Sequence, residues 1–272
     1  MRRLLTSIAV SLVFVSPASG TPVDPLLVDE CAFPAAWSPP FVHVYRLRNG
    51  GTLVFVGVRH GDDAPTHASI RSAFDRYKPN LVLVEGVSAD KSPDPDYLKF
   101  VIDDADQRVQ AGHPDEVAYT IKLAADAGVA LSGWDRTPAQ EYSASIANGF
   151  ALDDVLGAHL IRRRANPLDG ASEAAIRSEL RYAAGIKRLD AFDYVAWYHR
   201  TYGDQFVQAN GTPCGQGIAS RIVKFETAER NRHLIDLIGS RVGKGKTVLI
   251  EAGANHWLAL SDWLRSISTR MT

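Results

Sequence analysis

Leu53-Val-Phe-Val-Gly-Val-Arg-His60 is an apolar run that ends in the phrase Gly-x-x-His, and Thr247-Val-Leu-Ile-Glu-Ala-Gly-Ala-Asn-His256 repeats that phrase near the other end of the chain. Between them, Leu81-Val-Leu-Val-Glu85-Gly86 also ends in an ionisable residue. Short β-branched runs are typical of strands in a sheet that is covered on both faces. Polar residues just past such strands line a shared crevice. The sequence therefore predicts that two imidazoles and a carboxylate share one edge of a sheet.

The flanking segments predict an α/β fold with a mixed central sheet and flanking helices. Residues 41–48 alternate as a half-buried strand, and Asn49-Gly50-Gly51 predicts a hairpin into the strand at 52–58. Strands are also expected at 81–85, 129–135 and 247–252, and helices at 67–77, 97–109, 115–127, 226–241 and 257–268. This alternation of strands and helices indicates a layered α/β sandwich.

The middle of the chain, from about Pro138 to Val223, shows helical periodicity and no convincing strand. It predicts a helical insertion that caps the sheet or forms a lid. Arg162-Arg163-Arg164 lies inside it. A charge run this short is more often a solvated helix face than a handle for an anionic substrate.

The N-terminus predicts a secretory signal peptide over residues 1–20. Arg2 and Arg3 precede the mostly apolar stretch Leu4–Val15, and small residues at Ala18 and Gly20 suit cleavage. That stretch is shorter than the roughly 20 apolar residues of a membrane span. We therefore expect an exported protein, periplasmic or extracellular, with no membrane span after cleavage and with residues 21–272 as one α/β hydrolase-like domain.

The mature chain would carry 28 basic and 31 acidic residues, a net charge of −3. A charge so close to neutral predicts neither nucleic acid nor an anionic membrane as a partner. The sequence also contains no His-Glu-x-x-His helix, Gly-x-Ser-x-Gly elbow or dinucleotide fingerprint. These absences remove the main support for zincin, serine α/β-hydrolase and dehydrogenase functions.

The candidate site consists of His60, Glu85, Asp135 and His256, with Glu116 and Arg230 as possible additions. Imidazole can serve as a base or a metal ligand near neutral pH, and carboxylates can orient it or carry protons. The alternative is a pair of structural histidines. Glu116 would in any case be favoured at a helix N-terminus, and Arg230 suits a surface helix as well as an anion in the cleft. If functional, both histidines should matter little for packing.

Four segments in this order resemble the TraB/PrgY/GumN and Tiki group: Gly57-Val-Arg-His60, Lys78-Pro79-Asn80-Leu-Val-Leu-Val-Glu85-Gly86, Glu229-Arg230-Asn231 and Gly253-Ala-Asn-His256. The wider superfamily includes erythromycin esterases and ChaN-like haem-binding lipoproteins. The resemblance covers about Thr52 to Leu264, with the middle helices poorly matched. It implies a site at His60, Glu85 and His256, with Glu116 and Asp135 as further acidic positions. Relatives often carry a glutamate where this chain has Asp135.

The resemblance implies a function because Tiki proteins are metal-dependent proteases and the esterases open a macrolide lactone. The leading hypothesis is an exported hydrolase that cleaves an ester or peptide bond in a small molecule or peptide. His60 or His256 would activate water, directly or on a divalent metal ion held by His60, Glu85 and His256. The alternatives are a non-catalytic module that binds haem, iron or a small ligand in the same cleft, and a scaffold with a degenerate site.

Cys31 and Cys214 are the only cysteines of the chain. Export to an oxidising compartment favours a single disulfide between them over two separate thiols. Two cysteines alone do not make a zinc site.

We predict that mass spectrometry of the exported protein, without reductant, will show the loss of two protons and no alkylated thiol. Closing so long a loop stabilises the fold by about 4–5 kcal/mol in the chain-entropy model, so reduction should lower the melting temperature. Two freely alkylated thiols in the exported protein would contradict the pairing.

Overall fold

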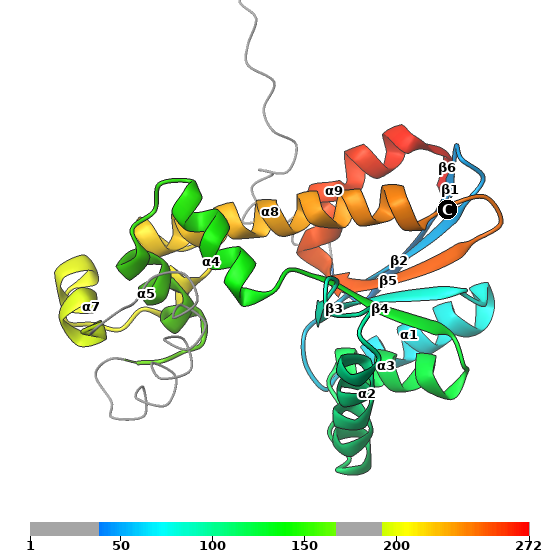
Figure 1. Cartoon of the computed structure of the whole chain (residues 1–272), viewed down its shortest axis with the longest axis horizontal. Helices are drawn as coiled ribbons and strands as arrows, with labels where there is room; N and C mark the ends of the chain where they lie inside the picture. Colours follow the sequence, from blue (N-terminus) through cyan, green and yellow to red (C-terminus); the bar gives the residue numbers. More distant parts are fainter. Residues whose placement is uncertain (1–37, 167–191, 272) are drawn as a thin grey trace, which may run out of the picture.

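The computed structural model describes residues 38–166 and 192–271. This part of the chain forms a six-stranded sheet in the order β4-β3-β5-β2-β1-β6, with helices on both faces and a group of helices to one side (Figure 1). The strands are β1 (Phe41–Leu47), β2 (Thr52–Val58), β3 (Leu81–Ser88), β4 (Ala130–Asp135), β5 (Thr247–Gly253) and β6 (Ser268–Met271). The predicted α/β class with a mixed sheet is confirmed.

Strand direction determines where the candidate residues lie. β1 and β2 form the predicted antiparallel hairpin, whereas β2, β5, β3 and β4 run parallel to one another. Parallel strands end at the same edge of a sheet, so the residues that follow β2, β3, β4 and β5 meet there. β6, which pairs antiparallel with β1, was not predicted. Its sequence, Ser-Thr-Arg-Met, is short and largely exposed, and so lacks a burial pattern.

Both faces of the sheet are buried. One core cluster contains Leu53 and Phe55 of β2 and packs against α8 (Gly217–Arg241) and α9 (Ala254–Ile267). The other contains Val54 and Val56 and packs against α1 (Ala64–Tyr77), α2 (Pro95–Gln110) and α3 (Glu116–Asp126). Alternate residues of a strand point to opposite faces, which explains why β2 is apolar throughout.

The helical insertion has a core of its own. It comprises α4 (Pro138–Ala147), α5 (Leu152–Arg162), α7 (Tyr194–Tyr202) and the 3-10 helix η3 (Gln208–Gly211). Tyr142, Leu156 and Trp197 pack there with Ile222 from α8. Residues 167–191 of the predicted insertion lie outside the described residues.

α8 begins at Gly217, nine residues before the predicted start at Glu226. Ile222 packs into the insertion core, whereas Leu234 and Ile238 pack against the sheet. The helix therefore runs from the insertion to the sheet (Figure 1) and has no single apolar stripe along its length. Because the packing partner changes along α8, apolar periodicity in the sequence did not predict its first turns.

Within residues 38–166 and 192–271, the helices are all too short or too polar to cross a bilayer. Residues 1–20 and Cys31 lie outside the described residues, so the signal peptide and the disulfide stay predictions.

We predict that Gly133→Ala lowers the free energy of unfolding by about 3 kcal/mol. A Cβ at this position in β4 would lie 1.9 Å from the backbone oxygen of Val87, and backbone cannot move aside as a flexible side chain can. The control is Gly239→Ala in α8, where a Cβ meets open space. It should stabilise the helix by about 0.5–1 kcal/mol. Urea unfolding measures both changes, and similar effects of the two variants would contradict the strand packing.

Candidate functional site

The six residues singled out from the sequence lie at one edge of the sheet. His60 follows β2, Glu85 lies in β3, Asp135 ends β4, and His256 lies in the first turn of α9 after β5. Glu116 comes from the start of α3 on one face, and Arg230 comes from α8 on the other. Contacts between these side chains join the two helical layers across the ends of the strands.

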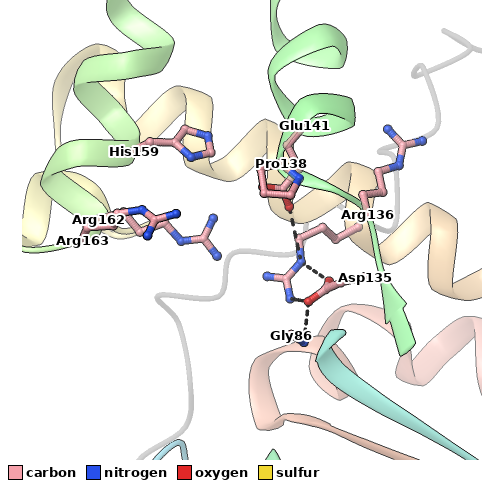
Figure 2. A pocket seen from close by; sticks show the side chains of 9 residues that line it. Gly86, Asp135, Arg136, Pro138, Glu141, His159, Arg162 and Arg163 are labelled. Atoms are coloured by element: carbon pink, nitrogen blue, oxygen red, sulfur yellow. Dashed lines mark hydrogen bonds and ion pairs between the residues drawn. The ribbon is translucent and has the colours of Figure 1, made fainter. Parts of the chain in front are cut away.

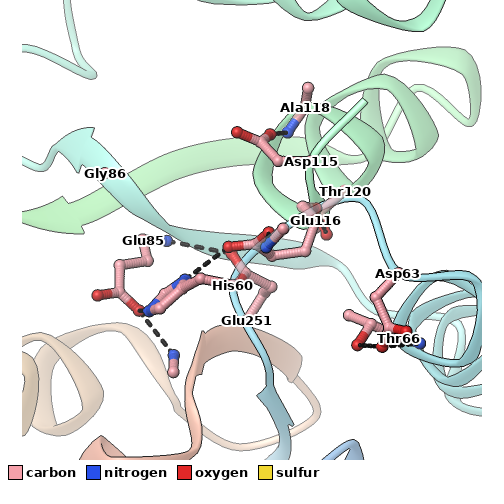
Figure 3. Close-up of polar contacts among 12 residues, drawn as sticks. His60, Asp63, Thr66, Glu85, Gly86, Asp115, Glu116, Ala118, Thr120 and Glu251 are labelled. Atoms are coloured by element: carbon pink, nitrogen blue, oxygen red, sulfur yellow. Dashed lines mark hydrogen bonds and ion pairs between the residues drawn. The ribbon is translucent and has the colours of Figure 1, made fainter. Parts of the chain in front are cut away.

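The Glu85 carboxylate lies at the centre of the group, and the residue is only 7% exposed. Its Oε1 accepts a hydrogen bond from Arg230 Nη2 at 2.6 Å, and His256 Nε2 lies 3.4 Å from the same atom. Its Oε2 accepts from the Gly253 N–H at 2.6 Å and lies 3.9 Å from His60 Nε2 (Figure 3). Burial alone would raise the pKa of Glu85, but His256, Arg230 and His60 hold this pKa well below its usual range.

Arg230 ties Glu85 to Asp135. Its Nε donates to Asp135 Oδ1 at 2.7 Å, and its Nη2 lies 3.0 Å from Asp135 Oδ2. The guanidinium also lies over the Trp134 ring. Gly86 donates its N–H to Asp135 Oδ2 at 2.7 Å from a φ of 75°, a conformation that favours glycine. Burial would lower the pKa of Arg230, but the adjacent carboxylates raise it, so this arginine is a permanent buried cation.

His60 and Glu116 form a dyad (Figure 3). His60 Nδ1 lies 2.6 Å from Glu116 Oε1, and the Gly61 N–H donates to Glu116 Oε2 at 2.8 Å. Glu116 is buried, whereas the His60 side chain is 59% exposed. The hydrogen bond with Glu116 raises the pKa of His60 more than burial lowers it. With Nδ1 bound to the carboxylate, Nε2 is the atom that can exchange a proton with a ligand or water.

His256 differs from His60 although the sequence presents the two alike. It is 1% exposed, its Nδ1 lies 2.7 Å from Asn231 Oδ1, and its ring packs edge-on against Trp134. The expectation that both histidines matter little for packing is therefore wrong for His256. The buried ring fills space in the fold and also presents Nε2 to Glu85.

The glycines of the two Gly-x-x-His phrases each make room for an aromatic ring. A Cβ at Gly57 would lie 2.3 Å from the ring of Phe41. A Cβ at Gly253 would lie 2.8 Å from His60 Nε2. The absence of a side chain at Gly253 thus leaves space for His60, so the two Gly-x-x-His motifs are in contact in the fold.

Glu251 is a buried carboxyl that sequence reasoning did not single out. Its Oε2 accepts a hydrogen bond from the Glu85 N–H at 3.3 Å, and the residue is 0% exposed. Burial and the nearby Glu85 raise the pKa of Glu251 well above its usual range. A glutamate inside the apolar run Thr-Val-Leu-Ile-Glu-Ala-Gly was the available signal.

A pocket of about 400 Å³ lies beside this edge, between the sheet and the insertion. In the view of Figure 2, Asp135, Arg136 and Glu141 lie on one side of the pocket, and His159, Arg162 and Arg163 lie on the other. Arg230 also lines the pocket. Arg162 and Arg163 therefore face a pocket, not only solvent. Glu141, His159 and Glu226 bring three ligand atoms within 4.8 Å of one another and could hold a metal ion.

A metal ion held by His60, Glu85 and His256 was one expectation from the resemblance. In the structure Glu85 accepts hydrogen bonds on both oxygens, and the two imidazoles approach opposite oxygens of this carboxylate. Among the described residues, Glu141, His159 and Glu226 meet the spacing of a metal site. At the sheet edge, Arg230 and the Gly253 N–H hold the Glu85 carboxylate.

At this edge the buried Glu116 carboxylate orients the partly exposed His60. His60 also adjoins Glu85, which the buried Arg230 holds in place. Comparisons with models of known protein families, with curated proteins and with solved structures find no match to this chain.

Proposed function

We propose that the chain is an exported hydrolase that cleaves an ester or peptide bond at the sheet edge. The observation that carries this proposal is the His60–Glu116 dyad, in which a buried carboxylate orients a half-exposed imidazole. A carboxylate of this kind fixes the tautomer of the histidine and stabilises the imidazolium that forms during proton transfer. The order of the Gly-x-x-His phrases and of Glu85 and Arg230 supports a TraB/Tiki type of protein.

In the proposed reaction His60 Nε2 removes a proton from a water molecule, and the water oxygen attacks the carbonyl carbon. The bond to the leaving oxygen or nitrogen then breaks, and His60 returns the proton to the leaving group. Glu116 keeps the ring oriented through both steps. The exposure of the His60 side chain, 59%, allows water and substrate to reach Nε2.

The start of α9 is suited to stabilise the oxyanion of this reaction. A Cβ at Gly253, the N-cap of α9, would touch His60 Nε2, so the helix begins beside the proposed base. In the described part of the chain no side chain caps this helix end, and the first N–H groups of a helix are donors with a favourable dipole. Glu85 and Arg230 would fix the position of the helix through the Gly253 N–H and His256.

The divalent metal expected from the resemblance is not used in these steps. Arg230 and the Gly253 N–H occupy both oxygens of Glu85, and these two donors would have to separate before the carboxylate could bind a cation. Each step is therefore assigned to the residues of the chain itself.

The second candidate function is a binding module for haem, iron or a small ligand. The pocket of about 400 Å³ favours a small ligand, since sites of such ligands span roughly 300–1,000 Å³. A screen of p-nitrophenyl esters and fluorogenic peptides separates the two functions. Turnover that depends on His60 supports the hydrolase, whereas tight binding without turnover supports the module.

We predict opposite profiles for the two histidines. His60→Ala should change the free energy of unfolding by less than about 1 kcal/mol because the side chain is exposed, and lower kcat/KM about 100-fold or more. His256→Ala should cost about 2 kcal/mol or more because it empties a buried site and breaks the contact with Asn231. His199→Ala, in α7, is the control and should leave the rate unchanged.

Thermal melts and hydrolysis of the best substrate from the screen measure these effects. A His60→Ala protein that is folded and fully active would exclude His60 as the base. A large loss of stability in this variant would instead indicate a structural histidine.

The pH dependence should report the titration of His60. The neutral imidazole is the base, so activity is present above its pKa and is lost as the pH falls through that pKa. Glu116 raises this pKa above 6.5, so Glu116→Gln should move the acidic limb of the kcat/KM profile to lower pH. Asp62→Asn removes the same charge from the nearby loop and should leave the limb in place. An unmoved limb in Glu116→Gln would show that another group titrates.

A further inference from the structure

We propose that Glu141, His159 and Glu226 form a binding site for a divalent transition-metal ion in the helical insertion. This site is separate from the histidine dyad, and the proposal does not depend on the hydrolase function. Glu141 comes from α4, His159 from α5 and Glu226 from α8, so the ion would join three helices.

The ligand atoms are already close to a coordination geometry. One atom from each residue lies within 4.8 Å of the others, and His159 Nε2 lies 2.9 Å from Glu226 Oε1. Ligands on one ion with bonds of about 2.0–2.2 Å lie roughly 3–4 Å apart, so small side-chain rotations are sufficient. Ser145 Oγ donates to Glu226 Oε1 at 2.9 Å and would orient this carboxylate from behind, as outer hydrogen bonds commonly do at metal sites.

An unsatisfied oxygen is the second, independent sign of a ligand. The Glu226 side chain is 1% exposed, yet its Oε2 accepts no hydrogen bond from the described residues. Arg162 Nη1 lies 4.0 Å from this oxygen, beyond hydrogen-bonding distance. A buried carboxylate oxygen without a partner destabilises the fold, and a coordinated cation would satisfy it.

Two carboxylates lie close together away from water. The Glu141 side chain is 14% exposed and the Glu226 side chain is 1% exposed, and a cation between them would offset their mutual repulsion. Arg162, Arg163 and Arg230 line the same pocket. Arg230 lies 3.9 Å from Glu141 but donates its hydrogen bonds to Asp135 and Glu85. The positive charge of Arg230 repels a metal cation, but its hydrogen bonds do not occupy the Glu141 carboxylate.

The donor set determines the class of metal. One imidazole and two carboxylates suit Mn²⁺, Fe²⁺ or Zn²⁺, whereas Ca²⁺ and Mg²⁺ prefer oxygen ligands alone. Three protein ligands leave coordination positions for water or a bound molecule. Glu141 and His159 both line the pocket (Figure 2), so these open positions would face it.

The test titrates the metal-free mature chain with Mn²⁺, followed by the loss of the free-ion electron paramagnetic resonance signal, and with Zn²⁺ by calorimetry. We expect one ion per chain. Glu141→Gln and Glu226→Gln should weaken binding at least tenfold. Glu229→Gln, in the same helix but paired with Arg136 and Arg232, is the matched control and should stay within twofold of the wild type. His60→Ala should also stay within twofold.

Two further measurements keep the outcome independent of folding defects in Glu226→Gln. Glu141 lines the pocket, and its replacement by Gln preserves the shape of the side chain. If Glu226→Gln fails to fold, Glu141→Gln therefore provides the test. In the wild type, bound Mn²⁺ should show nitrogen coupling from one imidazole, and saturating metal should raise the melting temperature. No binding by the folded wild type, equal binding by all variants, or loss of binding in His60→Ala would each overturn the proposal.

Discussion

The buried ion network of Arg230, Glu85 and Asp135 is the interaction on which the rest of the site depends. Its cation comes from α8, and its two carboxylates come from β3 and from the end of β4. A buried ion pair gains little stability over apolar packing, but losing one partner leaves an uncompensated charge. The network therefore acts chiefly as a positional constraint. It fixes Glu85 so that this carboxylate can hold the start of α9 through the Gly253 N–H.

α8 carries this constraint to the insertion. Glu226 and Arg230 are four residues apart, so they lie on the same side of the helix, one turn from each other. Arg230 contacts the sheet edge, whereas Glu226 contacts His159 in α5. The pocket lies between these two polar groups and is lined by Arg230 together with Glu141 and His159. One rigid helix thus sets the spacing between the proposed proton-transfer site and the proposed metal site.

Glu251 and Glu85 show how burial and neighbouring charge act on two adjacent carboxyl groups. Both are buried at the same sheet edge, but Glu85 faces Arg230 and both histidines, whereas the Glu251 side chain accepts the Glu85 N–H. The cations hold the pKa of Glu85 down, and burial raises the pKa of Glu251. The pKa values of these two carboxyl groups therefore shift in opposite directions.

The sequence by itself determined the sheet and its polar edge, because local alternation, Asn49-Gly50-Gly51 and polar residues after apolar runs reflect short-range physics. It therefore placed His60, Glu85, Asp135 and His256 at one edge, and the structure brings Glu116 and Arg230 there too. Only the tertiary structure decided that His60 is exposed and His256 is buried, since helix packing on each face sets their environments. It alone could also join Glu141, His159 and Glu226, whose proximity depends on how three separate helices pack and leaves no local pattern in the sequence.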